Sequence, residues 1–168
     1  IEIIEQKFIE GAERAAKAGF HGVDVNAGAN HLLASFLSRQ WNARTDKYGC
    51  ESIENRTRIV RNIIQGIKKR NGADFPVMVT INGLENGYGE PGQTIEESCE
   101  IAKLLEQAGA DAFQVRASEA YNRLYYWTEQ YYYPEKRDPL PPTLDFSHKG
   151  IGAYTPVTSE IKKAVSVP

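Results

Sequence analysis

The chain has 168 residues, of which 41% are hydrophobic and 25% charged, a balance typical of a folded globular domain. Its 20 basic and 22 acidic residues give a net charge of −2 without long blocks of like charge, so we expect neither nucleic acid nor a membrane surface as a partner. No apolar run approaches the roughly 20 residues of a transmembrane helix. Cys50 and Cys99 lack zinc-type spacing, which predicts reduced thiols, no metal site and a cytoplasmic protein.

The first part of the chain predicts two helices with a strand between them. Apolar residues recur at helical spacing from Ile4 to Ala18, and Gly19 stands where a helix commonly ends. Val23 to Asn26 predicts a short strand, and Leu32 to Leu37 predicts one or two further helical turns. A polar loop follows these turns.

The middle of the chain predicts a long helix and a second strand. Ser52 is suited to cap a helix whose apolar stripe continues to about Asn71-Gly72. Phe75 to Ile81 is rich in β-branched residues, which favours a strand. A loop with four glycines, Gly83 to Gly92, comes next.

The remainder predicts two more helices and a third strand. Thr94 and Glu97 form a capping-box pattern at the start of a helix that closes at Gly109. Asp111 to Val115 predicts the strand, and Pro156 to Ala164 predicts the final helix.

Residues 117–150 form a long aromatic and proline-rich insertion. Its tyrosines and a tryptophan lie between positions 121 and 133. These side chains are suited to lining a site for a flat or bulky substrate, or to ordinary packing and a subunit interface.

Strands that alternate with helices predict the α/β class, with a parallel sheet covered by helices. An open sheet and part of an eight-stranded barrel both fit this pattern, although a complete barrel takes about 250 residues. The chain opens on Ile1 close to a predicted helix, and it stops at Pro168 on the kind of sequence that opens a buried strand. Both ends therefore indicate positions inside a larger fold.

Two groups of motifs in the first third of the chain match the pattern of one enzyme family. Residues 18–26 (AGFHGVDVN) and 32–38 (LLASFLS) are similar to AGFDGVEIH…YLLNQFLS. Residues 42–49 (NARTDKYG) and 52–56 (SIENR) are similar to N-x-R-T-D-E-Y-G…S-L-E-N-R. In these motifs the chain resembles the old yellow enzyme family, and the resemblance covers most of residues 4–116.

The resemblance implies a partial (β/α)8 TIM barrel in which the chain supplies roughly strands four to six with their helices. Residues 1–168 would then form a single partial FMN-binding domain, truncated at both ends. Members of the family bind FMN at the carboxyl ends of the strands and transfer hydride from the reduced flavin to an activated C=C bond. We expect an NAD(P)H:flavin-type ene-reductase as the intact protein, and no activity from this piece alone.

The resemblance also implies site residues. Asn26 matches the family's first carbonyl-binding histidine, and Ala29 matches the second such residue, which is a histidine or asparagine. Ala29 has no side-chain donor, so Asn30 or His31 is the candidate for that role. Asn26 and His31 are therefore the predicted catalytic residues.

Thr80 matches a family arginine near the flavin N1 and C2 carbonyl. Strand alternation places Met78, Thr80 and Asn82 on one face, with Gln114 and Arg116 on the matching face of the next strand. Thr80 and Arg116 are thus the predicted cofactor-binding residues, Arg116 supplying the missing positive charge. Alternatively, Arg116 pairs with a carboxylate such as that of Glu119.

Residues 25–33 and 80–83 resemble a branch of the family that contains 2-enoate reductases and naphthoyl-CoA reductases. This implies an unsaturated acid or acyl-CoA substrate. It also implies a [4Fe–4S] cluster, FAD and NAD(P)H in parts of the parent protein outside this chain. We expect a homo-oligomer, because the open strand edges of a partial barrel favour association.

Two other functions stay open. Thr80 and Ala29 are compatible with a flavin-free barrel enzyme such as a lyase, and the aromatic insertion is compatible with a non-catalytic assembly module.

A separate hypothesis concerns Arg44, Asp46 and residues 54–56, which we expect to form one buried network of hydrogen bonds and ion pairs that fixes a loop.

Overall fold

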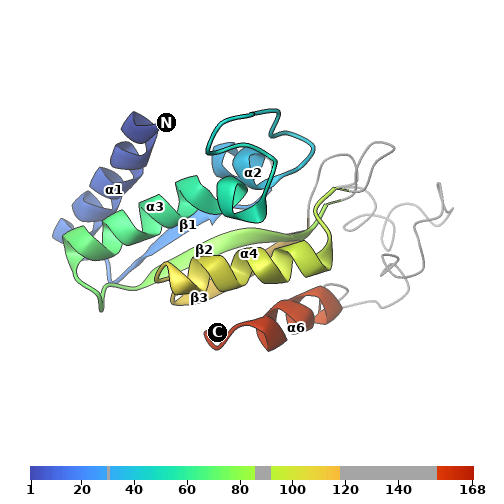
Figure 1. The fold of residues 1–168 in the computed structure, drawn as a ribbon. Helices are drawn as coiled ribbons and strands as arrows, with labels where there is room; N and C mark the ends of the chain where they lie inside the picture. The colour runs from blue at the N-terminus through green and yellow to red at the C-terminus, as the bar shows by residue number, and fades with distance from the viewer. Residues whose placement is uncertain (30, 86–91, 118–154) are drawn as a thin grey trace, which may run out of the picture.

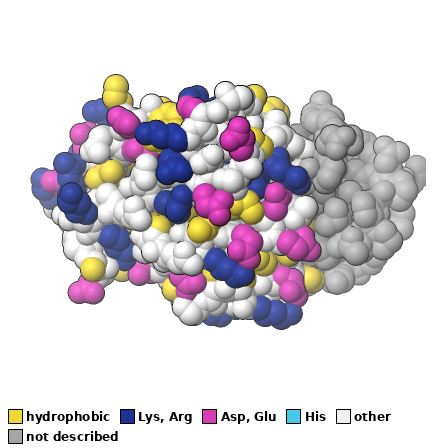
Figure 2. All heavy atoms as spheres, viewed as in Figure 1, with side chains coloured by type: hydrophobic (Ala, Val, Ile, Leu, Met, Phe, Trp, Pro, Cys, Tyr) yellow, Lys and Arg dark blue, Asp and Glu magenta, His cyan; other side chains and the backbone are white. Residues whose placement is uncertain are grey.

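The computed structural model describes residues 1–29, 31–85, 92–117 and 155–168. Apart from residue 117, the predicted aromatic insertion lies outside these ranges, as do Asn30 and Glu119. No helix within the described ranges is both long and apolar enough to cross a membrane. Figure 2 shows basic and acidic side chains mixed over one face of the molecule.

Helices and strands alternate as the sequence predicts (Figure 1). In chain order they are α1 (Glu2–Lys17), β1 (Val23–Ala27), α2 (Leu32–Leu37), α3 (Ile53–Asn71), β2 (Val77–Leu84), α4 (Ile95–Gln107), β3 (Ala112–Ala117) and α6 (Thr155–Ala164).

The strands form one three-stranded parallel sheet in the order β1-β2-β3. In Figure 1, α3 and α4 lie next to each other over the same face of this sheet. The α/β class with parallel strands is therefore confirmed. The assignment of these strands to positions four to six of a barrel stays a prediction.

The central strand β2 is longer at its carboxyl end than the sequence predicts. The expected loop begins at Gly83, but the strand continues to Leu84. Gly83 lies at an irregularity in the pairing with β3, and a Cβ at this position would come within 2.8 Å of a methyl group of Val115. A glycine inside a strand commonly marks such a close approach. The prediction that a loop begins at Gly83 is therefore wrong, because it took this glycine as a turn residue.

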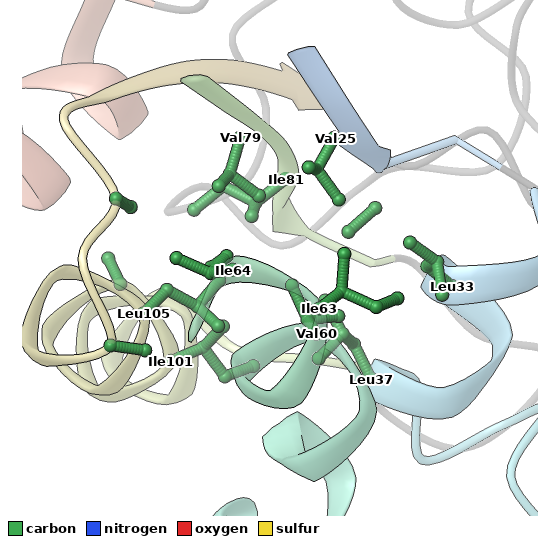
Figure 3. Packing of buried hydrophobic residues seen from close by; sticks show 14 of the residues in the cluster. Val25, Leu33, Leu37, Val60, Ile63, Ile64, Val79, Ile81, Ile101 and Leu105 are labelled. Carbon is green, nitrogen blue, oxygen red and sulfur yellow. The ribbon is translucent and has the colours of Figure 1, made fainter. Parts of the chain in front are cut away.

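The hydrophobic core lies between the sheet and the helices (Figure 3). Val79 and Ile81 project from β2 toward the apolar stripes of α3 and α4 and are completely buried. Fully burying one such side chain contributes about 1.5–3 kcal/mol. The helix residues in contact with this layer include Val60, Ile63, Ile64, Ile101 and Leu105.

Two predicted helix caps are confirmed. Ser52 Oγ accepts a hydrogen bond from Asn55 N–H at 3.1 Å and so begins α3. Thr94 and Glu97 form the reciprocal capping box of α4. Such caps satisfy backbone N–H groups that the helix itself leaves unbonded, each worth about 1 kcal/mol.

The hypothesis of one buried network around residues 44–56 is wrong. Arg44 and Asp46 pair with each other at the surface, where nearly half of each side chain is exposed. Arg56 is buried separately; it donates to Leu37 O at 3.0 Å and to Glu97 Oε1 at 2.8 Å. A buried guanidinium needs partners that sequence spacing does not reveal, and Glu97 lies 41 positions away.

The surface pair shapes the polar loop before α3. Asp46 also accepts a hydrogen bond from Tyr48 N–H at 3.0 Å. The Arg44 guanidinium, together with this N–H, lowers the pKa of Asp46 to about 2. The pair thus fixes a tight turn in which Gly49 N–H donates to Asp46 O at 2.7 Å.

Replacing Glu97 by alanine should lower the free energy of unfolding by about 3–5 kcal/mol, because the Arg56 guanidinium would stay buried without its carboxylate, and by about 1 kcal/mol more because α4 loses the Glu97 half of its capping box. Urea unfolding of the protein measures the change. Glu96→Ala is the matched control, since Glu96 is the preceding residue in the same helical turn and its side chain is exposed. Equal urea midpoints for the two variants would show that the buried ion pair does not stabilise the fold.

The Arg44–Asp46 pair should make the polar loop sensitive to acid. A carboxyl whose pKa is lowered by folding stabilises the protein above its unfolded pKa, near 3.8, and this contribution is lost as the pH falls toward 2. A carboxyl-carbon NMR titration should give Asp46 a pKa of about 2. Arg44→Ala should move that pKa up toward the ordinary value; an unchanged pKa would exclude the guanidinium as its cause.

Candidate functional site

The candidate site is the face of the sheet opposite the helices. We call it the polar strand face and define it by Asp24, Asn26, Met78, Thr80, Asn82, Gln114 and Arg116. The register pairs Asn26 with Thr80, Thr80 with Gln114, and Asn82 with Arg116. Because the strands are parallel, their carboxyl ends meet at the same edge, where the active sites of α/β folds lie.

Thr80 links the three strands on this face. Its hydroxyl lies 2.8 and 3.0 Å from the two oxygens of the Asp24 carboxylate, and its backbone N–H donates to Asp24 Oδ1 at 3.1 Å. The hydroxyl oxygen also lies 3.2 Å from Gln114 Oε1. A hydroxyl has a single proton, so it donates to Asp24, and the Gln114 contact is favourable when the amide turns its NH₂ toward Thr80.

Asp24 is the member of this face that sequence reasoning missed. It lies two positions before Asn26, so strand alternation alone places both side chains on the same face. Sequence reasoning assigned Thr80 to the cofactor without a protein partner, whereas the structure gives its hydroxyl to Asp24. The role of Thr80 toward a cofactor stays a prediction.

The two predicted catalytic residues lie on either side of the connection between β1 and α2: Asn26 is the second-last residue of β1, and His31 directly precedes α2. Asn26 is exposed, and its Oδ1 accepts a hydrogen bond from Gly28 N–H at 3.2 Å. That bond engages the acceptor of the amide, so the NH₂ group is the part suited to bind a carbonyl oxygen. His31 is also exposed and occupies the N-cap position of α2, where its backbone O accepts from Ser35 N–H.

Ala29, two residues after the end of β1, is attached to β2 through Asn82. Ala29 N–H donates to Asn82 Oδ1 at 2.7 Å, and Asn82 Nδ2 lies 3.3 Å from Ala29 O. Ala29 has a φ of 53°, in the left-handed region that non-glycine residues seldom adopt. Sequence alternation placed Asn82 on this face but gave no sign of a partner 53 positions earlier.

A buried group of polar side chains lies behind Asn82. Asn82 Nδ2 donates to Glu85 Oε1 at 3.0 Å, and Ser38 Oγ donates to Glu85 Oε2 at 2.6 Å. Gln93 Nε2 donates to Asn82 O at 2.8 Å. Asn82, Glu85, Ser38 and Gln93 are all at most 6% exposed. Their mutual bonds satisfy most of the polar groups that burial removes from water.

Arg116 is partly buried at the carboxyl end of β3. It follows Gln114 on the same face and is the register partner of Asn82. It therefore places a permanent positive charge on the polar strand face. Over the described residues, no three His, Cys, Asp or Glu side chains gather in the manner of a metal site.

The sequence is similar to proteins of known activity. The profile of the NADH:flavin oxidoreductase / NADH oxidase family matches residues 1–132. The chain is 34% identical over 168 residues to the NADH oxidase of Thermoanaerobacter brockii, covering 100% of this chain and 23% of that protein. It is 36% identical over 174 residues to the cinnamate reductase of Clostridium sporogenes, covering 96% of this chain and 24% of that protein.

A solved structure shares both fold and sequence with the chain. It is a 2-naphthoyl-CoA reductase in complex with 2-naphthoyl-CoA, with a TM-score of 0.74 and 32% identity over 99% of this chain and 22% of that protein. The chain thus spans less than a quarter of the length of these relatives.

Proposed function

The chain belongs to the NADH:flavin oxidoreductase / NADH oxidase family, and from this premise we propose that it forms the substrate-facing part of an FMN-dependent reductase of activated C=C bonds. The membership confirms the resemblance found in the sequence. The relatives extend well beyond the length of this chain, so the activity proposed is that of the full-length protein.

One observation carries the proposal. The chain aligns along almost its whole length with a cinnamate reductase and with a 2-naphthoyl-CoA reductase, and its polar strand face brings together Asn26 and Thr80, which are register partners on β1 and β2. The two relatives are named for an unsaturated acid and an aromatic acyl-CoA. We therefore propose an α,β-unsaturated acid or its acyl-CoA thioester as the substrate class.

The residues present fit part of an FMN site. The pyrimidine edge of a flavin carries both hydrogen-bond donors and acceptors, and the exposed side-chain amide of Gln114 can serve either kind. Arg116 adds a positive charge near that amide, which suits an anionic reduced flavin. When bound, FMN would supply the hydride for reduction of the C=C bond.

Asn26 is proposed to act on the substrate carbonyl. Its NH₂ group would donate to the carbonyl oxygen and so stabilise the enolate-like charge that develops there in the transition state. His31, at the other end of the loop, is the second proposed donor to that oxygen. Asn26 is neutral, so this donation adds no charge to the site.

Other expectations for the parent protein stay proposals. A [4Fe–4S] cluster, FAD and NAD(P)H would bind in parts of the protein outside this chain, and the protein would be a homo-oligomer. A flavin-free barrel enzyme and a non-catalytic assembly module are the outcomes that would replace the reductase.

The full-length protein, purified without oxygen, should contain FMN and reduce cinnamate or cinnamoyl-CoA. The flavin absorption should bleach on chemical reduction and return when the acceptor is added, with the saturated acid or thioester as the product. The absorption spectrum and chromatography of the product measure both steps. A protein that contains no flavin and does not bind added FMN would exclude the reductase and favour a flavin-free enzyme or an assembly module.

Arg116→Ala in the full-length protein should weaken FMN binding by roughly tenfold and lower the flavin reduction potential, because the reduced anion loses a cationic neighbour. Fluorescence titration of the apoprotein with FMN and a dye-coupled redox titration measure the two effects. Arg58→Ala is a suitable control, since Arg58 lies on α3 and donates to Lys47 O away from the polar strand face. Unchanged affinity and potential in Arg116→Ala would refute this role.

A further inference from the structure

We propose that Asn82 is a positioning residue: it holds the start of the connection between β1 and α2 in the shape whose Gly28 N–H bonds and orients the side-chain amide of Asn26 at the end of β1. This inference rests on the proposed function. Asn82 itself is 3% exposed and does not reach the exposed surface where a substrate would bind. It would act only through the loop.

The contacts between Asn82 and the loop engage both the backbone N–H and the backbone C=O of Ala29. Asn82 Oδ1 accepts from Ala29 N–H at 2.7 Å, while Asn82 Nδ2 lies 3.3 Å from Ala29 O. A side-chain amide can accept and donate in this parallel manner without carrying a charge. These contacts join β2 to a loop residue 53 positions earlier in the sequence and hold the backbone of Ala29 against β2.

The loop conformation needs such support. Ala29 has a φ of 53°, which a residue with a Cβ adopts at an energetic cost unless its surroundings hold it there. The preceding residue packs directly on β2: a Cβ on Gly28 would lie 2.9 Å from Thr80 Cγ2 and 3.4 Å from Asn82 Oδ1. The close packing of Gly28 and the bonds to Ala29 together define the path of the backbone from Asn26 to Ala29.

The orientation of the Asn82 amide is itself fixed. Nδ2 donates to Glu85 Oε1 at 3.0 Å, and Glu85 is held by Ser38 Oγ at 2.6 Å. Ser38 is the C-cap residue of α2, the helix that begins after His31. The chain of bonds from Ser38 through Glu85 and Asn82 to Ala29 therefore ties the end of α2 and the loop before it to the end of β2. Because Glu85 attracts the NH₂ group, Asn82 Oδ1 is directed at Ala29 N–H.

The first test is the hydrogen-exchange rate of the Ala29 amide in the full-length protein, resolved by overlapping peptides. In Asn82→Ala this amide loses its acceptor, and its exchange should become roughly 10–100-fold faster. Asn62→Ala is the matched control, because Asn62 Nδ2 also donates to a buried carboxylate, Glu5 Oε1, at 2.9 Å, but between α1 and α3. The control should leave the Ala29 rate unchanged. If Ala29 exchanges in Asn82→Ala as slowly as in the unmodified protein, the inference is wrong.

The second test separates positioning from general damage. With cinnamate as substrate, Asn82→Ala should lower kcat/KM by roughly 10–100-fold, mostly through kcat, while FMN affinity changes less than about twofold. In an Asn26→Ala background the same change should have little further effect, because the donor that Asn82 positions is already gone. Fully additive losses in the double variant would contradict the inference.

A conservative variant keeps the inference testable if Asn82→Ala unfolds. In Asn82→Asp, a deprotonated carboxylate would face Ala29 O and the Glu85 carboxylate, whereas the protonated form can accept and donate as the amide does. Its kcat relative to the unmodified protein should therefore rise as the pH is lowered from 8 to 6, and Ala29 exchange relative to the intrinsic rate should slow. If the ratio of the kcat of Asn82→Asp to that of the unmodified protein does not change with pH, the positioning role of Asn82 is refuted.

The two proposals fail in different ways. Absence of cinnamate reduction in the unmodified protein would refute the proposed substrate class, but the Ala29 exchange rates would still decide whether Asn82 holds the loop. Reduction of cinnamate with no response of kcat to Asn82→Ala would leave the proposed function intact and overturn the positioning role.

Discussion

The central strand β2 is the constraint on which the described structure depends. It pairs with a neighbour on each side and is covered on its helix-facing side, so almost every residue from Val77 to Leu84 is buried. Its apolar side chains fill the core under α3 and α4, and its polar side chains, Thr80 and Asn82, support the opposite face. A slip of one residue in its register would exchange these two sets, placing hydroxyl and amide groups in the core. The identity of the polar strand face is therefore fixed by the same packing that stabilises the fold.

Side chains of the polar strand face are held by contacts with one another and with groups beside the face. Thr80 is bonded to Asp24 on β1 and lies beside Gln114 on β3, while Asn82 is bonded to the β1–α2 loop and to Glu85. Such cross-links satisfy groups that would otherwise be costly to bury, and they also hold three strands and a loop at fixed distances. A site whose supporting side chains are locked in this way can place a hydrogen-bond donor accurately without moving when a substrate arrives. Support of this kind suits the proposed role of Asn26.

The sequence resemblance predicts that Thr80 takes the place of a family arginine, and the contacts of Thr80 are compatible with such a replacement. A guanidinium at position 80 would face the Asp24 carboxylate, whereas the threonine hydroxyl donates to it and leaves its negative charge in place. The positive charge of this face comes instead from Arg116, one strand away. If FMN binds as proposed, its surroundings contain a carboxylate on one strand and a guanidinium on another. The balance between these charges would help to set how strongly the reduced flavin is stabilised.

The sequence by itself determined what depends on neighbouring residues. Helical periodicity, the caps at Ser52 and Thr94, and strand alternation predicted the elements and assigned Thr80 and Asn82 to the polar face. These signals are local, since they arise from backbone geometry over a few residues. The family motifs predicted the membership in the same way, because they are runs of adjacent residues.

Only the tertiary structure decided which distant groups meet. The partner of Thr80 is Asp24, that of Asn82 is Ala29, and that of Arg56 is Glu97, at separations of 56, 53 and 41 positions. The strand at Gly83 was likewise misassigned, because a glycine that avoids Val115 has the same local signal as a glycine in a turn. Hydrogen bonds and ion pairs depend on a distance of a few ångströms in space, and not on how far apart the two residues are in the sequence. The partner that satisfies a buried polar group is therefore chosen by how the strands and helices pack.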